Sequence, residues 1–235
     1  MSSVVICSKS LRKRHKEGYI PVIPDIKCKS PAEGDLIRGR DPVSLAKGLE
    51  AAGAPVISVV TENDRYGGSI QLLSDITKSV NVPVLRKDFI TDEEEIRKSI
   101  DNGASSVLLI SSIMTKNCLF KLIEKSLSLG IEPLVEIHTE DELKAVKNLN
   151  LSFLGINNRD ITRWEMDNGT VNNTENLAAE IPEGALLVSE SSISSIEDIR
   201  RAVKAGAHSV LIGTAILKAE DSLGVYRSFA NLKST

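Results

Sequence analysis

Residues 82–103 read V-P-V-L-R-K-D-F-I-T-D-E-E-E-I-R-K-S-I-D-N-G and contain one strand, one loop and one helix in succession. Residues 82–86 form a short apolar run without helical periodicity, which is typical of a buried strand. Residues 87–91 are a short loop, and residues 92–102 have the pattern of a helix that ends at Gly103. The stretch therefore predicts a βα unit, in which a strand is followed directly by a helix.

The same unit recurs along the chain, so the sequence predicts eight strands and eight following helices. Strict alternation of short apolar strands with helices is typical of a parallel sheet that is buried on both faces. Eight units in one run favour a closed (β/α)8 TIM barrel over an open doubly wound sheet, and no G-x-G-x-x-G follows the first strand. The other predicted strands are residues 22–26, 55–60, 105–110, 131–137, 153–157, 185–190 and 208–213, and the other predicted helices are residues 42–52, 69–80, 115–129, 139–147, 174–180, 195–204 and 222–232.

No strong linker interrupts this pattern, so residues 1–235 are expected to form a single α/β domain. Residues 1–18 are expected to be a short N-terminal extension in which residues 8–18 form a basic helix. Two interpretations of this helix stay open. It is either a lid that attracts substrate or a solvated helix that packs on the barrel wall together with His15, and we favour the wall.

Two of the predicted helices carry recognisable start signals. Asp41 precedes Pro42, and an N-cap aspartate before a proline at the first helical position is a strong start signal. The sequence T-E-D-E at residues 139–142 has the spacing of a capping box, in which Thr139 and Glu142 would satisfy each other's backbone N–H groups.

Composition limits the function classes. The chain has 41% hydrophobic and 26% charged residues, a net charge of −3 and only 3% aromatic residues, which argues against nucleic-acid binding and against a membrane surface. No apolar run approaches the roughly 18 residues of a membrane helix, and no signal peptide is recognisable, so we expect a cytoplasmic protein. Cys7, Cys28 and Cys118 are too few and too scattered for a disulfide framework or a metal site, and the sequence identifies no protein partner.

The first predicted strand runs into V-I-P-D-I-K-C-K-S-P at residues 22–31, where the polarity changes abruptly. Because side chains alternate faces along a strand, Asp25 and Lys27 point the same way. If that way is inward, a carboxylate and an ammonium lie side by side at one end of the barrel. In TIM barrels the strand C-termini and the loops after them form the catalytic end, here called the mouth.

The other strand ends are also rich in functional groups. A single lysine or asparagine after a strand is usually ordinary loop chemistry. Two lysines, an arginine and two carboxylates that converge on one mouth favour a functional site instead. The strand ends and their loops supply Asp25, Lys27 and Ser30; Thr61, Glu62 and Tyr66; Lys87, Asp88 and Phe89; Ser111; Glu136 and His138; Asn157, Asn158 and Arg159; Ser189, Glu190, Ser191 and Ser192; and Gly213 and Thr214.

The last two units carry a separate signal. In TIM barrels a phosphate group often binds at the loops after strands seven and eight, where backbone N–H groups approach it. The sequences E-S-S-I and I-G-T-A supply small residues at these loops. Gly213 lacks a Cβ that would obstruct an anion, and the hydroxyls of Ser191 and Thr214 can donate hydrogen bonds. We therefore expect a phosphate site there.

From residue 21 to about residue 219 the chain resembles the indole-3-glycerol phosphate synthase family of tryptophan biosynthesis. The resemblance rests on nine motifs in order: D-I-K-C-K-S-P, S-V-V-T-E, G-G-S, P-V-L-R-K-D-F-I, G-A-S-S-V-L-L-I, L-V-E-I-H, G-I-N-N-R-D, V-S-E-S and L-I-G-T. It implies a carboxy-lyase that closes the pyrrole ring of 1-(2-carboxyphenylamino)-1-deoxyribulose 5-phosphate and releases CO2 and water. It also implies that no metal or organic cofactor takes part.

The resemblance assigns roles to individual positions. Lys87 is expected to protonate the sugar ketone, and Lys27 and Glu136 are expected to serve the later proton transfers. Asn157 and Arg159 are expected to orient and stabilise the intermediate, and Arg159 or Lys27 to pair with the substrate carboxylate. The implied catalytic positions are Lys87, Glu136, Lys27, Asp25 and Asn157. The implied substrate-binding positions are Ser30, Tyr66, Phe89, Arg159, Glu190, Ser191, Ser192, Gly213 and Thr214. Among these, Tyr66 and Phe89 are expected to contact the anthranilate ring, and the phosphate is expected to contact Ser30, Ser191, Gly213 and Thr214.

The chain departs from the family pattern in three places. Asp25 stands where the family usually has glutamate, Ser192 stands where it usually has a glycine suited to positive φ, and the N-terminal extension is short. Two alternatives stay open at this point. One is a sugar-phosphate isomerase similar to phosphoribosylanthranilate isomerase, which would leave Lys27 and Lys87 without a task. The other is a non-catalytic paralogue that binds a phosphosugar.

Overall fold

The predicted strands form a closed parallel barrel in the computed structural model, which describes residues 6–159 and 169–234. Strands that follow one another along the chain are neighbours in the barrel, and β1 pairs with both β4 and β10, which closes it. The TIM barrel prediction is therefore confirmed. The strands are β1 (Val22–Ile26), β4 (Ile57–Val60), β5 (Val84–Lys87), β6 (Ser106–Ile110), β7 (Glu132–Ile137), β8 (Phe153–Asn157), β9 (Leu186–Glu190) and β10 (Ser209–Ile212).

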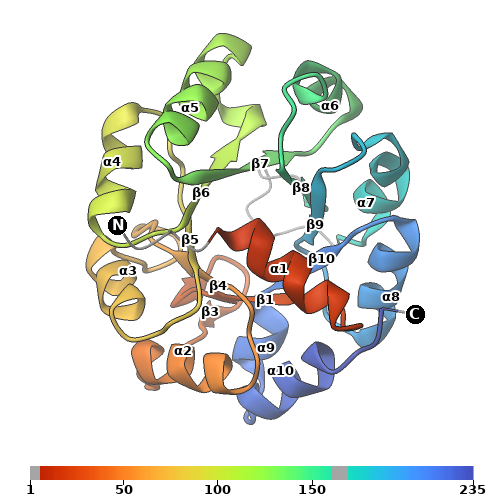
Figure 1. Cartoon of the computed structure of the whole chain (residues 1–235). Coiled ribbons are helices and arrows are strands. Elements are labelled where there is room, and N and C mark those ends of the chain that lie inside the picture. Colours follow the sequence, from red (N-terminus) through yellow and green to blue (C-terminus); the bar gives the residue numbers. More distant parts are fainter. Residues whose placement is uncertain (1–5, 160–168, 235) are drawn as a thin grey trace.

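Helices form the outer ring around this barrel, as Figure 1 shows. They are α2 (Pro42–Ala51), α3 (Ile70–Thr77), α4 (Glu93–Asp101), α5 (Lys116–Ser128), α6 (Glu140–Val146), α7 (Asn172–Leu177), α8 (Ile196–Ala205) and α10 (Ser222–Ala230). The sequence patterns did not predict three short elements in the loops at the mouth. These are the hairpin of β2 (Lys29–Ser30) and β3 (Gly34–Asp35), the short helix η1 (Ser111–Ile113) and the short helix α9 (Thr214–Lys218). Another short helix, η3 (Ala178–Glu180), directly follows α7 and lies within the predicted helix 174–180.

The strand side chains alternate between two hydrophobic cores. On β6, Val107 and Leu109 belong to the layer between the strands and the helices, while Leu108 and Ile110 belong to a smaller core inside the barrel. Because both faces are buried, each strand reads as a continuous apolar run rather than as an alternating one. The period of two along each strand therefore decides which polar residues at the strand ends point into the mouth.

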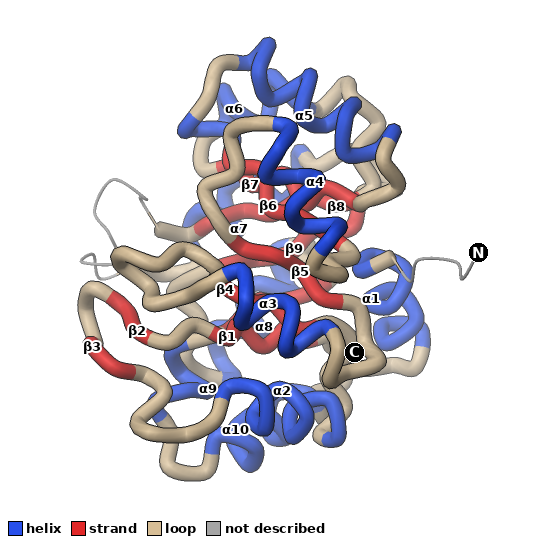
Figure 2. Tube along the Cα trace, turned by 90° about the vertical axis from the view of Figure 1, so that its left-hand side faces the viewer, coloured by secondary structure: helices blue, strands red, loops and turns tan. Residues whose placement is uncertain are grey.

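Helix α1 (Cys7–Lys16) closes the end of the barrel opposite the mouth. Cys7 and Leu11 are fully buried in the inner core, and the backbone N–H of Ser8 donates to Glu132 at the start of β7 over 2.9 Å. Figure 1 shows α1 lying across the barrel opening, and Figure 2 shows α1 and the β2–β3 hairpin at opposite ends of the barrel. Both interpretations of this helix were therefore wrong: it is neither a lid on the mouth nor a helix on the wall.

The two start signals had different outcomes. The Asp41 carboxylate accepts hydrogen bonds from the N–H groups of Val43 and Ser44 at 3.3 and 2.9 Å, which confirms the predicted cap of α2. The Thr139 hydroxyl caps the Glu142 N–H of α6 at 3.3 Å, but the Glu142 carboxylate accepts from the N–H of His138 instead of Thr139. The predicted reciprocal capping box was therefore wrong, because the Glu142 side chain is occupied by His138.

Some predicted features lie outside the described residues: residues 1–5 of the extension, and Asp160, the last residue of the motif G-I-N-N-R-D. Within the part of the chain that the structure describes, none of the helices combines the length and the apolar character needed to cross a bilayer. The three cysteines are free thiols, as expected.

Candidate active site

Two adjoining pockets lie at the mouth, and most of the predicted site residues line them. The first pocket encloses about 680 Å³ and the second about 470 Å³, both partly open to solvent. They share Asp25, Lys27, Lys87, Arg159 and Ser191. The first pocket is also lined by Val60, Glu62, Tyr66, Asp88, Phe89, Leu108, Ile110, Glu136 and Asn157, and the second by Ser192, Ile193, Leu211, Ile212, Gly213 and Thr214.

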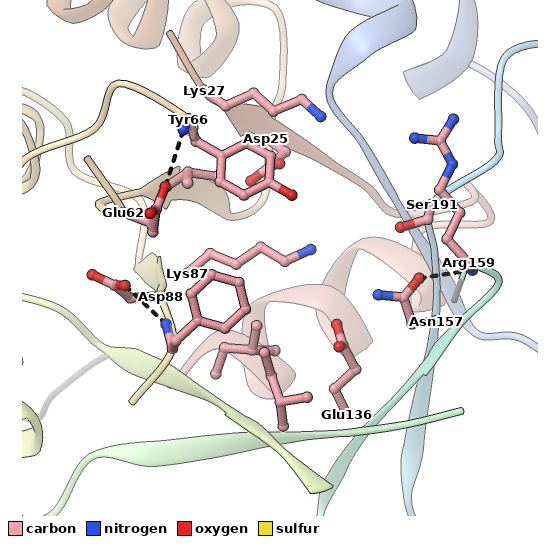
Figure 3. A pocket seen from close by; sticks show the side chains of 14 residues that line it. Asp25, Lys27, Glu62, Tyr66, Lys87, Asp88, Glu136, Asn157, Arg159 and Ser191 are labelled. Atoms are coloured by element: carbon pink, nitrogen blue, oxygen red, sulfur yellow. Dashed lines mark hydrogen bonds between the residues drawn. The ribbon is translucent and has the colours of Figure 1, made fainter. Parts of the chain in front are cut away.

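The two pockets differ in character. The first has an apolar wall built by Phe89, Leu108 and Ile110, the last two being the inward-facing residues of β6. In Figure 3, Lys27 and Lys87 extend toward the same space, and Arg159 and Ser191 lie across it. Beyond the residues that the two pockets share, the second pocket is lined by the end of β10 and by the loops after β9 and β10. Together they suit a molecule with a planar apolar part at one end and a polar group at the other.

Asp25 and Lys27 both face the mouth, as the period of two along β1 predicted. Asp25 is buried, and its Oδ1 accepts a hydrogen bond from the Ser58 hydroxyl of β4 at 2.6 Å. The same register pairs Asp25 with Ser58 across the two strands. The carboxylate is therefore held in place by the neighbouring strand.

Lys87 is the last residue of β5, and its ammonium lies among three carboxylates. Its Nζ donates to Glu190 Oε2 over 3.0 Å, while Asp25 and Glu136 act on it electrostatically. Burial alone would lower the pKa of Lys87, but these carboxylates outweigh burial and raise the pKa above its ordinary value. Lys87 therefore carries a proton at neutral pH, which is the state that a general acid needs.

Glu190 lies beneath the pocket rather than in its lining. It is fully buried on β9, and burial raises the pKa of its carboxyl to about 7 against the lowering effect of the Lys87 ammonium. Its Oε2 accepts the hydrogen bond from Lys87, and its expected role as a substrate-binding residue stays a prediction. The sequence does not distinguish a strand-end residue that lines a pocket from one that lies behind the lining, because both follow the same local pattern.

Gly155 on β8 makes room for the Glu190 carboxyl. A Cβ at Gly155 would lie 2.1 Å from Glu190 Oε1, far inside van der Waals contact. The backbone conformation of Gly155 is not the reason for the glycine, since its φ is not positive. The G-I-N-N-R-D motif contains this glycine, but sequence reasoning missed its function.

Gly155→Ala is expected to lower kcat on the order of 10²-fold with little change in KM, because the new methyl group displaces the carboxylate that holds Lys87. Steady-state kinetics beside thermal unfolding separates this effect from simple destabilisation. In a Glu190→Ala background, where space is available, Gly155→Ala should add little further loss. An equal loss in both backgrounds would contradict the explanation.

Asp25→Asn is expected to lower kcat by roughly 10- to 10²-fold, because it keeps the shape of the side chain but removes one of the charges around Lys87. Asp25→Glu keeps that charge and restores the family's usual residue, so its kcat should equal or exceed that of the wild type. The measurement is kcat for both variants at one pH. Equal losses in the two variants would show that the site is built around the shorter side chain.

Glu136 is buried at the end of β7 and lines the first pocket. Burial would raise the pKa of Glu136, but His138 and Lys87 outweigh burial and hold it below its ordinary value. His138 lies beside this carboxylate, with its Nε2 3.3 Å from Glu136 Oε1. Glu136 is therefore an ionised carboxylate in an enclosed site, which suits a general base.

The β8 end combines a pocket residue with an anchoring residue. The Arg159 N–H donates to Asn157 Oδ1 over 3.0 Å, and both side chains line the first pocket. Asn158 points away and donates to the backbone carbonyls of Glu190 and Ser191 at 2.9 and 3.3 Å. Sequence reasoning did not assign Asn158 a site role, although it holds the turn that follows β9.

That turn has an unusual backbone. Ser191 and Ser192 have φ values of 65° and 57°, in the left-handed region that favours glycine. This confirms the expectation that Ser192 occupies a positive-φ position. Gly213 was expected to leave space for an anion, but a Cβ there would lie 3.0 Å from the Asp25 carbonyl oxygen and 3.2 Å from Asp25 Cβ. The absent Cβ of Gly213 therefore allows close packing against Asp25.

Ser30, like Glu190, is a predicted site residue that lines neither pocket. It is buried in β2, and its hydroxyl accepts a hydrogen bond from the Glu33 N–H at 3.2 Å. The hydroxyl thus stabilises the β2–β3 turn. The hydroxyl accepts this bond and keeps its own proton to donate, so the expected phosphate contact of Ser30 stays a prediction.

The fold and the site define the class: this is a TIM-barrel enzyme with ionised lysine and carboxylate side chains at its mouth. A family model described as indole-3-glycerol phosphate synthase matches residues 5–229. The chain is 46% identical over 222 residues to the indole-3-glycerol phosphate synthase of Pyrococcus furiosus, covering 94% of this chain and 95% of that protein. It is 42% identical over 213 residues to that of Pyrococcus abyssi and 40% identical over 214 residues to that of Thermococcus kodakarensis, with 91% of this chain and 92% of the relative covered in both cases. The chain belongs to the indole-3-glycerol phosphate synthase family.

Proposed function

We propose that the chain converts 1-(2-carboxyphenylamino)-1-deoxyribulose 5-phosphate to indole-3-glycerol phosphate, with loss of CO2 and water. The observation that supports this most directly is the Lys87 ammonium held among Glu190, Asp25 and Glu136 at the edge of a pocket with an apolar wall. A simple isomerase would not need both Lys87 and Lys27 at the mouth. The family membership favours the synthase over the isomerase alternative.

Ring closure requires the sugar ketone to gain a proton while the aromatic carbon attacks it. Lys87 is the acid in this proposal, because the surrounding carboxylates keep it protonated and fix its direction. The C–C bond then forms, the proton stays on the new hydroxyl, and loss of the carboxylate as CO2 restores the aromatic electrons.

Loss of water completes the pyrrole ring and needs a proton donor for the leaving hydroxyl and a base for the proton on the ring. Glu136 is the proposed base, since it is ionised and lines the pocket. Lys27 is the second cation that lines both pockets and is placed to serve the leaving hydroxyl or the substrate carboxylate.

The two pockets suit the two ends of this substrate. The anthranilate ring fits the apolar wall of the first pocket with Phe89 and Tyr66, and Arg159 is placed for its carboxylate. The phosphate group fits the second pocket, where Ser191, Ser192 and Thr214 offer hydroxyl and backbone N–H donors. We also propose that the enzyme works in the cytoplasm.

The test is direct addition of the substrate to the purified chain while indole fluorescence is recorded. We expect indole-3-glycerol phosphate to form at an unchanged rate in the presence of EDTA, because the chemistry proposed here uses only side chains. Activity that EDTA abolishes and a divalent cation restores would contradict this mechanism. Binding of the substrate without turnover would instead support the non-catalytic alternative.

A further inference from the structure

His138 forms a bridge between the proposed base and the helix outside the barrel. It follows β7, and its side chain is only 9% exposed. Its Nε2 lies 3.3 Å from Glu136 Oε1, and its Nδ1 lies 3.3 Å from Glu142 Oε2 on α6. Each ring nitrogen therefore lies within ion-pair distance of a carboxylate oxygen, while among the described residues Nε2 itself makes no hydrogen bond.

This geometry decides the protonation state of the ring. An ionised carboxylate only accepts hydrogen bonds, whereas a neutral imidazole has one nitrogen with a lone pair. A neutral His138 would direct that lone pair at one of the two carboxylates. Burial alone would lower the pKa of His138, but Glu136 and Glu142 raise it to about 10. The ring is therefore an imidazolium at neutral pH.

The outer end of the bridge is firmly held. The Glu142 carboxylate accepts hydrogen bonds from the His138 N–H at 2.9 Å and from the Ser111 hydroxyl. The Thr139 hydroxyl in turn caps the Glu142 N–H at the start of α6. Glu142 is thus fixed by its own backbone, by η1 and by β7, and it can anchor the His138 ring.

The inner end reaches the pocket. Glu136 Oε1 is the atom facing His138, while Glu136 Oε2 is buried and makes no hydrogen bond within the part of the chain that the structure describes. The other charged groups that act on Glu136 are Lys87 of β5 and Glu190 of β9. The contact at Oε1 is therefore one of opposite charges at ion-pair distance, and Oε2 has no hydrogen-bond partner among the described residues.

We propose that His138 is a positioning residue whose imidazolium, anchored by Glu142, fixes the Glu136 carboxylate in its ionised form toward the pocket. This inference rests on the proposed function of Glu136 as the base. Because both ring nitrogens already carry protons, His138 is a fixed positive charge and does not relay the proton that Glu136 accepts. Among the described residues, no group of histidine, cysteine and acidic side chains is placed to hold a metal ion, and the bridge is no exception.

The first test does not depend on turnover. The chain has three histidines, so NMR of histidine-labelled protein can follow each ring during a pH titration. The His138 signal, identified by its absence in His138→Gln, should stay in the imidazolium form beyond pH 8. His208 is an internal reference, because burial lowers its pKa. A His138 ring that loses its proton below pH 7 would overturn the proposal, whether or not the enzyme is active.

The second test measures the effect of His138→Gln on catalysis. His138→Gln should lower kcat by up to about 10²-fold with little change in KM, since the base is misplaced while the substrate contacts remain. Loss of an adjacent positive charge also raises the pKa of Glu136. The acid limb of the kcat/KM profile should therefore move to higher pH by roughly one unit or more. An unchanged kcat and acid limb would overturn the proposal.

A matched pair of variants on α6 separates the bridge from general charge effects. Glu142→Gln should lower the pH at which His138 titrates and move the acid limb in the same direction as His138→Gln. Glu140→Gln removes the same charge from the same helical turn, but Glu140 is exposed and paired with Lys144. It should change neither readout, and equal effects of the two variants would contradict the bridge.

Discussion

Lys87→Ala is expected to lower kcat by roughly 10²- to 10⁴-fold, the usual contribution of a positioned general acid. The reason is geometric as well as chemical, because the Lys87 ammonium is held at 3.0 Å from Glu190 and lines both pockets. The measurement is kcat from indole fluorescence at saturating substrate. A variant that retains the wild-type kcat would show that Lys87 is not the acid.

The same variant should also affect stability in a pH-dependent way. Removing one partner of a buried ion pair commonly costs about 3–5 kcal/mol, because the other charge is left uncompensated. Here burial already raises the pKa of Glu190 to about 7, so the carboxyl can take up a proton and avoid this cost. Thermal unfolding of Lys87→Ala should therefore approach that of the wild type below pH 7, and the difference should grow as the pH rises. Lys121→Ala on the exposed face of α5 is the control, with no change expected in kcat.

Glu136→Gln is expected to lower kcat by a similar factor of roughly 10²- to 10⁴-fold, because glutamine keeps the shape but cannot accept the proton released on dehydration. Substrate affinity should be retained, since the proposed phosphate contacts lie in the second pocket, which Glu136 does not line. Kinetics and equilibrium binding of the unreacted substrate to the variant measure the two effects separately. A large loss of affinity with an unchanged kcat would assign Glu136 to binding instead.

Local sequence patterns were sufficient to predict the architecture and much of the pocket lining. The repeated βα units and their apolar strands predicted the barrel, because parallel strands buried on both faces allow little else. The period of two along β1 then predicted that Asp25 and Lys27 share the mouth, and both line the pockets. These features depend on short-range patterns, in which the chain's own geometry connects residues a few positions apart.

The pairing of these side chains depends on the closed barrel and does not follow from any local pattern. Lys87 and Glu190 are 103 residues apart, and only the closure of the barrel brings them within 3.0 Å. The space for Glu190 comes from Gly155 on the next strand, and the restraint on Glu136 comes through His138 from Glu142 outside the barrel. The position of α1 was misjudged for the same reason, since Cys7 and Leu11 do not reveal which distant surface they cover. Such contacts depend on distances across the barrel, which no local pattern in the sequence contains.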